Sequence, residues 1–343
     1  MLREPVMNWD EVEYATEAEM TNHVQALRKR PFEFGTPNVE YLLLTSTLDG
    51  SRILAIKLDH GTYDGTLLRI FDEQFTAITR GDSKIPEPEP FKNFIDRIYA
   101  ADTDEDLEFW SSELETYEPK HTLPRKPVTD HIKFAPLSSD IDIDALATKL
   151  GVTPSTIFQV AYAIVTGKLT GTSDVLIDHL ITGRNVAVAR PQLLNGACAN
   201  FLPSRTILDP STPVSSFLKD AQAAFWASTE HGSVGLHDIY QALGQDRDEY
   251  SAKMLFCFQP FDPVPTGTKV NHMRWVVLAQ SKIFMTINYA LMVEVQRTLT
   301  GYRLKLQWDS HAFVGETIDG VVTMFDAVFA KMKANTAAQI GTF

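Results

Sequence analysis

The sequence predicts an α/β protein with two lobes. Segments with helically spaced apolar residues alternate along the chain with short, β-branched runs, the pattern of α/β folds. The chain has 343 residues, and compact domains usually contain about 100 to 200. A polar stretch with prolines, residues 118–130, is the expected boundary. We therefore expect an N-terminal lobe over residues 1–125 and a C-terminal lobe over residues 126–343.

The first half should contain one hairpin among several helices. In chain order, the expected elements are a helix over residues 10–30, strands over 41–48 and 52–58, a helix over 67–78 and a helical region over 91–117. The dipeptide Asp49-Gly50 separates the two strands and favours the positive φ angles of tight hairpin turns. The second strand leads directly into the segment Asp59 to Gly65, which should form a strand-to-helix loop.

The second half should contain a buried helix among several strands. Thr153 offers an N-cap and Pro154 a first helical residue before an almost wholly apolar segment. The other expected elements are strands over residues 174–181, 254–258, 274–278, 283–295 and 302–308, the last three as a meander, and helices over 214–228 and 317–332.

Composition excludes several classes of partner. The formal net charge of −13 repels polyanions, and no basic run with interleaved aromatic residues suggests nucleic-acid binding. Neither a membrane span nor an N-terminal signal peptide is visible, so we expect a cytoplasmic protein without a membrane partner. The two cysteines, Cys198 and Cys257, lack metal-ligand spacing and are interpreted as buried free thiols.

His60 is the strongest candidate for chemistry. It lies where a predicted strand ends, four residues before Asp64, in the kind of loop from which rigid elements often present reactive side chains. Acyl transfer needs a group that manages the proton lost by the nucleophile, and a histidine does so near neutral pH. The spacing alone is more typical of a capping or packing role.

Further motifs accompany this segment along the chain. Asp59 to Gly65 resembles the HHxxxDG motif of nonribosomal peptide synthetase condensation domains, in the YDG variant of fungal members. The resemblance continues in order through Trp110, Gly183-Arg184-Asn185, the GxxxNxLPxR pattern from Gly196 to Arg205, and the stretch His231, Leu236 and Ile239. These ordered matches are more specific than any one of them.

The resemblance implies a two-lobed, chloramphenicol-acetyltransferase-like fold with a tunnel between the lobes. His60 would be the catalytic residue, which deprotonates or orients the attacking amine or hydroxyl. Asp64 and Gly65 would order the site, with Asp64 paired to Arg184. The substrate would arrive on the phosphopantetheine arm of a carrier protein, with no bound cofactor.

Two departures from the family pattern matter. Asp59 stands where the motif has its first histidine; it and Asn200 are candidates for substrate contact. Only 59 residues precede His60, fewer than in the family, so the first lobe is expected to be short. A partner chain or a second copy could complete it.

The remaining histidines have structural interpretations. His179 lies inside a predicted strand and His311 near the end of another. His121, His131 and His272 show no ligand spacing, and we assign no metal. The acidic run from Asp102 to Glu108 is interpreted as a solvated helix start.

The sequence therefore predicts a condensation-type acyltransferase that forms an amide or ester from a carrier-bound thioester, including by cyclisation. Two alternatives stay open. One is a coenzyme A-dependent alcohol or amine acyltransferase of the same superfamily, although the DFGWG motif of that branch is missing from the sequence. The other is a non-catalytic module that only binds a carrier domain.

Overall fold

The computed structural model describes residues 8–85, 87–119, 123–138, 141–259, 269–270, 273–274 and 287–343. The chain divides into a first unit, Met1–Phe91 with Gln192–Cys198 and Thr266–Ile283, and a second unit, Lys92–Pro191 with Ala199–Pro265 and Phe284–Phe343. The expected lobe boundary at residue 125 falls inside the second unit. As a division into folding domains, that boundary stays a prediction.

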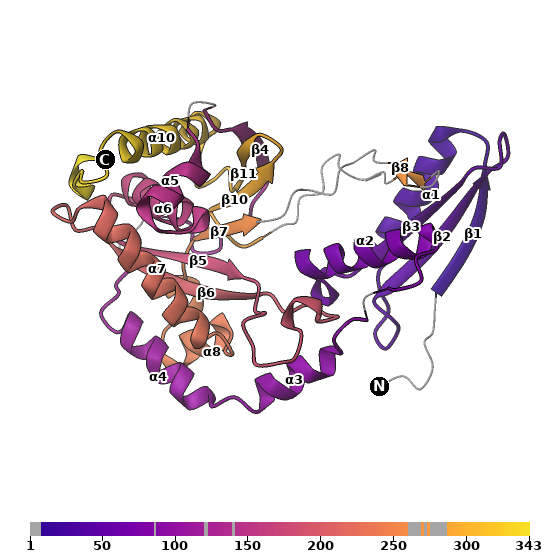
Figure 1. Ribbon diagram of the computed structural model, residues 1–343, viewed down its shortest axis with the longest axis horizontal. Helices are drawn as coiled ribbons and strands as arrows, with labels where there is room; N and C mark the ends of the chain where they lie inside the picture. The colour runs from indigo at the N-terminus through magenta and orange to yellow at the C-terminus, as the bar shows by residue number, and fades with distance from the viewer. Residues whose placement is uncertain are drawn as a thin grey trace. The chain divides into compact units, whose positions relative to one another are not determined.

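The first unit is built on a three-stranded sheet with the order β1-β2-β3 (Figure 1). Its elements are β1 (Asn8–Tyr14), α1 (Glu17–Lys29), β2 (Val39–Ser46), β3 (Arg52–Leu58), η1 (His60–Thr62), α2 (Gly65–Arg80) and the short hairpin β8 (Lys269–Val270) and β9 (Met273–Arg274). Strands β2 and β3 form the expected hairpin, and Gly50 has the positive φ, 69°, that the turn requires.

The first helix predicted from the sequence is partly wrong. Residues 8–14 form β1, which pairs in parallel with β2, and the helix begins only at Glu17. Along β1, exposed residues alternate with residues that face the core; the exposed ones are Trp9, Glu11 and Glu13. Val12 faces the core and packs with Leu42 and Leu44 beneath α1. This period of two fits a strand. Pairing with β2 decides the structure of a segment whose pattern is locally ambiguous.

The second unit is built on a mixed six-stranded sheet with the order β4-β11-β10-β7-β5-β6. Its strands are β4 (His131–Pro136), β5 (Asp174–Ile181), β6 (Asn200–Ile207), β7 (Met254–Gln259), β10 (Leu291–Thr298) and β11 (Gly301–Trp308). Its helices are α3 (Phe91–Tyr99, which starts at the last residue of the first unit), α4 (Thr103–Leu114), α5 (Ile143–Leu150), α6 (Pro154–Thr170), α7 (Val214–Glu230), α8 (Leu236–Ala242), α9 (Arg247–Tyr250) and α10 (Gly315–Ala334), with η2 (Pro191–Leu193) and η3 (Ile340–Thr342).

Both faces of this sheet carry helices. Val175 and Ile177 of β5 pack into a core with α5, α6 and α10, whereas Leu176, between them, packs into a second core with α4 and α8. Because side chains alternate across a strand, these cores lie on opposite faces. Helix α6 begins at Pro154 with Thr153 as its N-cap, as predicted, and most of its residues are buried.

Three other expectations need correction or fall outside the described residues. The helical region over residues 91–117 is two helices, α3 and α4, separated at residues 100–102. Of the strand expected over residues 274–278 only Arg274 is described; it belongs to β9, which pairs with β8. The expected meander is therefore limited to the antiparallel pair β10 and β11.

Among the described residues, no individual helix has the length and apolar character needed to cross a membrane. The pair α5 and α6 meets those two criteria only when taken together, across a bend of 97°.

Candidate active site

His60 lies at the corner between β3 and α2, as predicted from the sequence. Strand β3 ends at Leu58, one short 3₁₀ turn spans His60–Thr62, and α2 begins at Gly65. The Asp59 carboxylate accepts a hydrogen bond from the Gly61 amide at 2.9 Å. The Thr62 hydroxyl donates to the Asp59 carbonyl at 2.6 Å. Asp59 therefore shapes the turn that carries His60.

The His60 side chain is exposed. Its imidazole stacks on the phenol ring of Tyr63, with centroids 4.5 Å apart and planes within 3° of parallel. Within the described part of the chain, neither ring nitrogen has a hydrogen-bond partner. The ring is thus held by one face, and its nitrogen-bearing edges are available to a reactant.

Asp64 connects two segments of the first unit. One carboxylate oxygen caps α2 by accepting from the Leu67 amide at 2.7 Å. The other accepts from the Cys198 amide at 2.9 Å. Because Asp64 is only 7% exposed, both hydrogen bonds are shielded from water, where charge-assisted bonds are strongest. Asp64 thereby fixes the start of α2 relative to residues 192–198.

Residues 192–198 are held from their other side by the chain before α3. Glu89 donates its amide to the Leu193 carbonyl at 2.7 Å and accepts from the Asn195 amide at 2.9 Å. A Cβ atom at Gly196 would lie 2.2 Å from the Phe91 ring, so only glycine permits this contact. The sequence did not point to Cys198 as a partner of Asp64, because its contribution is a backbone amide.

Arg184 belongs to the second unit and is 1% exposed. Its guanidinium donates to the Pro191 carbonyl at 3.2 Å. The neighbouring Asn185 donates to the Thr229 carbonyl at 2.6 Å. The Gly-Arg-Asn segment thus orders the loop after β5. The expected ion pair of Arg184 with Asp64 stays a prediction.

Asn200 uses its side chain within the second unit. The amide donates to the carbonyls of Gly232 and Val234 at 3.1 and 2.8 Å, and its oxygen accepts from the Phe201 amide at 2.8 Å. Both N–H groups are occupied, which leaves no donor for a substrate carbonyl in this conformation. The geometry favours the structural interpretation of Asn200, and its contact with substrate stays a prediction.

Trp110 and His231, which the sequence analysis named separately, meet in one network. The Trp110 indole donates to the His231 carbonyl at 2.9 Å, and the His231 ring contacts Asp106 at 3.0 Å. Ser233 also donates to Asp106, which is 7% exposed. Asp106 is therefore an exception to the predicted solvated helix start. The network joins α4 to the turn after α7.

His179 is a core residue, as expected. Its ring contacts Phe225 and Phe256, with centroids 5.0 Å away in each case. Burial lowers the pKa of His179 to about 4, so the imidazole is neutral at physiological pH. Two other histidines of the sequence analysis, His121 and His272, lie outside the described residues.

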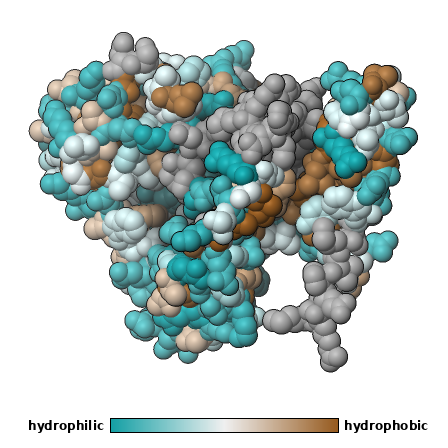
Figure 2. Space-filling model, turned by 45° about the vertical axis from the view of Figure 1, so that its right-hand side comes forward, coloured by the Kyte–Doolittle hydropathy of each residue, from teal (hydrophilic) through white to brown (hydrophobic). Residues whose placement is uncertain are grey.

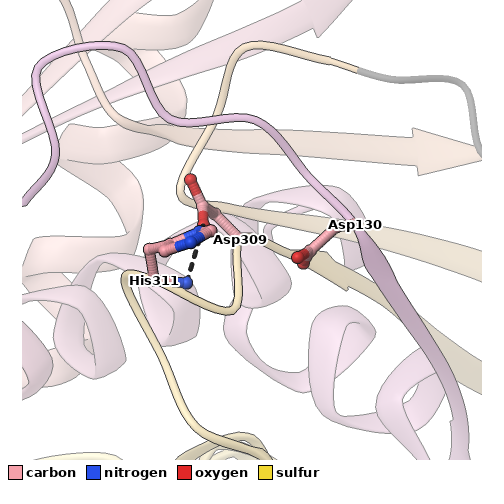
Figure 3. A group of neighbouring side chains, drawn as sticks. All are labelled: Asp130, Asp309 and His311. Atoms are coloured by element: carbon pink, nitrogen blue, oxygen red, sulfur yellow. Dashed lines mark hydrogen bonds and ion pairs between the residues drawn. The ribbon is translucent and has the colours of Figure 1, made fainter.

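One group of metal-type ligands occurs among the described residues. Asp130, Asp309 and His311 place their ligand atoms within 4.8 Å of one another (Figure 3). The His spacing of the sequence did not reveal this group, because Asp130 precedes β4 whereas Asp309 and His311 follow β11, far away in the sequence. Asp309 accepts from the Val128 amide at 2.8 Å and from the His311 amide at 2.7 Å.

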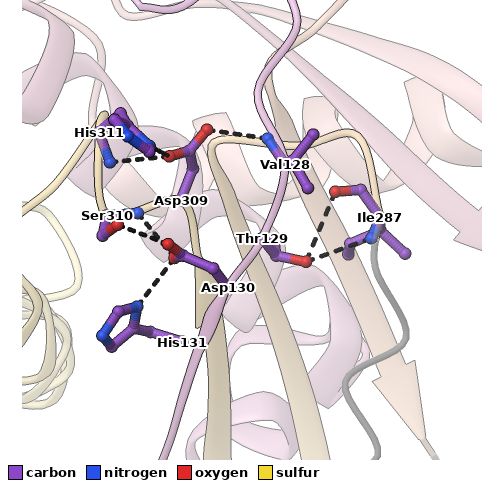
Figure 4. A network of polar contacts seen from close by, with 8 residues as sticks. All are labelled: Val128, Thr129, Asp130, His131, Ile287, Asp309, Ser310 and His311. Atoms are coloured by element: carbon purple, nitrogen blue, oxygen red, sulfur yellow. Dashed lines mark hydrogen bonds and ion pairs between the residues drawn. The ribbon is translucent and has the colours of Figure 1, made fainter.

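The remaining contacts of this group belong to the fold (Figure 4). Asp130 accepts from the Ser310 amide at 2.8 Å, from the Ser310 hydroxyl at 2.5 Å and contacts the His131 ring at 2.8 Å. Thr129 donates its amide to the Ile287 carbonyl at 3.0 Å. These bonds tie the start of β4 to the end of β11 and to the chain before β10. We assign the group to structure.

Comparison with known proteins identifies the family. A sequence model described as "Condensation domain" matches residues 7–343. The chain belongs to the condensation-domain family. Within this family it is 38% identical over 347 residues to nonribosomal peptide synthetase 7 of Aspergillus fumigatus, covering 99% of this chain and 14% of that protein. It is 35% identical over 323 residues to synthetase sidE of the same species, covering 93% of this chain and 15% of that protein.

Solved condensation domains share the fold. The condensation domain of the monacolin K polyketide synthase MokA has a TM-score of 0.72 and 16% identity over 97% of this chain and 80% of that one. The first condensation domain of the calcium-dependent antibiotic synthetase, solved with a substrate analogue, has a TM-score of 0.68 and 18% identity over 98% and 77%. The condensation domain described here thus has the expected chloramphenicol-acetyltransferase-like α/β fold, and it spans about a seventh of the length of the two fungal synthetases.

Replacement of Asp64 by alanine should destabilise the protein more than the matched change at Asp142. Both residues cap a helix, and loss of a cap costs about 1 kcal/mol. Asp64→Ala also removes the buried hydrogen bond to Cys198, which should add about 1 to 3 kcal/mol. Urea titration of the two variants gives the comparison. Equal losses in the free energy of unfolding would contradict the bridging role of Asp64.

The Asp130 network should give a pH-dependent contribution to stability. Burial alone would raise the pKa of Asp130, but hydrogen bonds from Ser310 and His131 outweigh it and lower the pKa from 3.8 to about 2. The stabilisation is therefore complete above about pH 4 and disappears as the pH falls through about 2.

Asp130→Asn should lower the free energy of unfolding at pH 7 by about 1 kcal/mol, a value reduced for solvent screening of this partly exposed group. The difference in the free energy of unfolding between Asp130→Asn and the unmodified protein should become smaller between pH 4 and the pKa of about 2. Urea titrations at several pH values measure it, with the exposed residue Asp82, changed to Asn, as control. A gap that is independent of pH would contradict the assignment.

Proposed function

We propose that this condensation domain catalyses bond formation between a carrier-bound acyl or peptidyl thioester and an amine or hydroxyl nucleophile. The single observation that supports it most is the exposed imidazole of His60, held by one face on Tyr63 at 4.5 Å with its edges available. Membership of a family whose fungal relatives are named nonribosomal peptide synthetases supports an acyl-transfer role for this imidazole.

The proposed reaction transfers an acyl group from sulfur to nitrogen or oxygen. The nucleophile forms a bond to the thioester carbonyl carbon, and the bond from that carbon to sulfur breaks. His60 accepts the proton that the nucleophile loses, or orients the nucleophile while this proton leaves, and the proton ends on the departing thiolate. The products are an amide or ester and the free thiol of the carrier arm. When the nucleophile belongs to the same acyl chain, the product is a ring.

The other site residues would act through His60. Asp64 and Gly65 set the start of α2 directly after the His60 turn. Arg184 would complete the order of the site by pairing with Asp64. Since Asp59 binds the Gly61 amide, we propose that it shapes the turn, in addition to any contact with substrate.

The proposed partner is a carrier protein or domain that presents the substrate on a phosphopantetheine arm. The relatives are much longer proteins, of which this chain covers 14% and 15%. The carrier arm would supply the activated acyl group, and His60 would supply the catalytic side chain. The proposed reaction therefore needs no further cofactor.

Replacement of His60 by alanine should reduce transfer from a carrier-bound donor about 10²- to 10⁴-fold, the usual contribution of a general acid or base. His237→Ala, which changes an exposed histidine on α8, is the matched control and should have unchanged activity. The measurement is product formation by mass spectrometry, with the free energy of unfolding of each variant recorded in parallel.

A folded His60→Ala variant with unchanged activity would overturn the assignment of the site. Wild type that transfers only from acyl-coenzyme A would instead identify a coenzyme A-dependent acyltransferase. Wild type that binds the carrier but transfers from neither donor would identify a non-catalytic carrier-binding module.

One face of α2, in the first unit, carries exposed apolar side chains. Helix α2 exposes the apolar side chains of Leu68, Phe71 and Ile78, which are 39%, 38% and 58% exposed. Hydrophobic surface is visible on the side of the molecule that carries this unit (Figure 2). The matched solved structures are longer, since the chain covers only 80% and 77% of them. We propose that additional polypeptide, from a partner chain or a second copy, covers these three side chains of α2.

Native mass spectrometry of the 343-residue chain tests this proposal. If a second copy supplies the cover, the particle should have twice the mass of the monomer, and the double change Phe71→Ser and Ile78→Ser should return it to monomer. Leu299→Ser, at a site that is 96% exposed in the second unit, is the control. A wild-type monomer would exclude the second copy and leave a partner chain as the cover.

A further inference from the structure

The stack between His60 and Tyr63 follows from the backbone of the turn. Residues His60–Thr62 form a 3₁₀ helix, and Tyr63 is its C-cap. A 3₁₀ helix has three residues per turn, so side chains three positions apart lie directly above one another. His60 and Tyr63 have this separation. Their rings are accordingly parallel within 3°, with centroids 4.5 Å apart.

Local hydrogen bonds hold the turn in this form. The Asp59 side chain accepts from the Gly61 amide at 2.9 Å, and the Asp59 carbonyl accepts from both the amide and the hydroxyl of Thr62, at 3.0 and 2.6 Å. The Asp59 amide itself donates to the Asn38 carbonyl at 3.1 Å, which fixes the turn to the segment before β2. All four contacts restrain the backbone on which the two rings are mounted.

The stack restrains His60 in a particular way. An exposed histidine ordinarily exchanges among several rotamers, and its ring plane is then undefined. Contact with the flat face of a half-buried tyrosine fixes that plane while leaving both nitrogen-bearing edges open. A hydrogen bond to the ring would orient it equally well but would occupy one of the nitrogens.

The Tyr63 hydroxyl is not required for this role. Burial, followed by the nearby charge of Asp59, raises the pKa of Tyr63 above its ordinary value of 10, so the phenol stays protonated at neutral pH. Stacking depends on the aromatic face, which phenylalanine also has.

We propose that Tyr63 is a positioning residue for His60, which sets the plane of the imidazole by face-to-face stacking so that a ring edge meets the nucleophile. This inference rests on the proposed function, since it assigns Tyr63 a role in the reaction at His60. It predicts that tyrosine and phenylalanine are interchangeable at position 63 and that an aliphatic residue of similar size is not.

Two measurements on the full chain test the inference. The first is NMR of protein labelled at histidine Cε1, with the His60 signal assigned by its loss in His60→Ala. Tyr63 should shift the His60 ring protons upfield through its ring current. This upfield shift should persist in Tyr63→Phe and disappear in Tyr63→Leu.

The second measurement is the steady-state rate with a carrier-bound donor. Tyr63→Leu should lower kcat about ten- to a hundredfold with little change in KM, the effect expected when a reacting group loses its alignment. Tyr63→Phe should retain the wild-type kcat. Tyr99→Leu, which changes a tyrosine that is 87% exposed on α3, is the matched control and should have no effect.

The outcomes separate this inference from the proposed function. If Tyr63→Leu retains full kcat while His60→Ala is inactive, the positioning role is wrong and the proposed function stands. Absence of an upfield shift in wild type would likewise overturn the stack. If a folded His60→Ala variant is fully active, the proposed function at His60 fails and the role of Tyr63 fails with it. If Tyr63→Leu does not fold, Tyr63→Met replaces it. Tyr63→Met should likewise lose the upfield shift of His60 and have a lower kcat.

Discussion

The buried carboxylate of Asp64 is the interaction on which the candidate site depends. Its two oxygens accept from amides that lie 131 positions apart in the sequence, Leu67 at 2.7 Å and Cys198 at 2.9 Å. One bond sets where α2 starts, and the other fixes that start to a segment that returns from the second half of the chain. A short acidic side chain suits this role, since an ionised carboxylate accepts strong hydrogen bonds in two directions.

The turn that carries His60 is built more locally. Asp59 closes a tight turn through the Gly61 amide, and this turn stacks His60 on Tyr63. The aspartate that replaces the first histidine of the family motif therefore has a physical role of its own. Long-range order comes from Asp64 and local order from Asp59, and His60 lies between them. This division explains how an exposed side chain can be held at a defined position.

Much of the architecture could be predicted from the sequence because it is encoded locally. Asp49-Gly50 between two β-branched runs specified the β2–β3 hairpin, and Thr153-Pro154 specified the start of α6. The first strand could not be predicted in this way. Asn8–Tyr14 joins β2 through a parallel crossover, so a non-local partner decides the structure of a segment whose charged and apolar residues fit either period.

The site shows the same contrast. His60, Asp64 and Arg184 carry side-chain chemistry that a motif can reveal. The partners Leu67 and Cys198 contribute backbone amides, and the need for glycine at position 196 arises from the Phe91 ring. Such contributions leave no signature in residue type. Likewise, the sequence predicted that Asp106 is a solvated acid of a helix start, because its partners His231 and Ser233 are distant in the sequence.

Native-state hydrogen exchange tests the central claim most directly, because the claim concerns two specific amides. The account predicts that the amides of Leu67 and Cys198 exchange far more slowly than in an unstructured peptide, and that replacing Asp64 by alanine removes the protection of both together. Rapid exchange at Cys198 in the unmodified protein, or loss of protection at Leu67 alone in the variant, would contradict it.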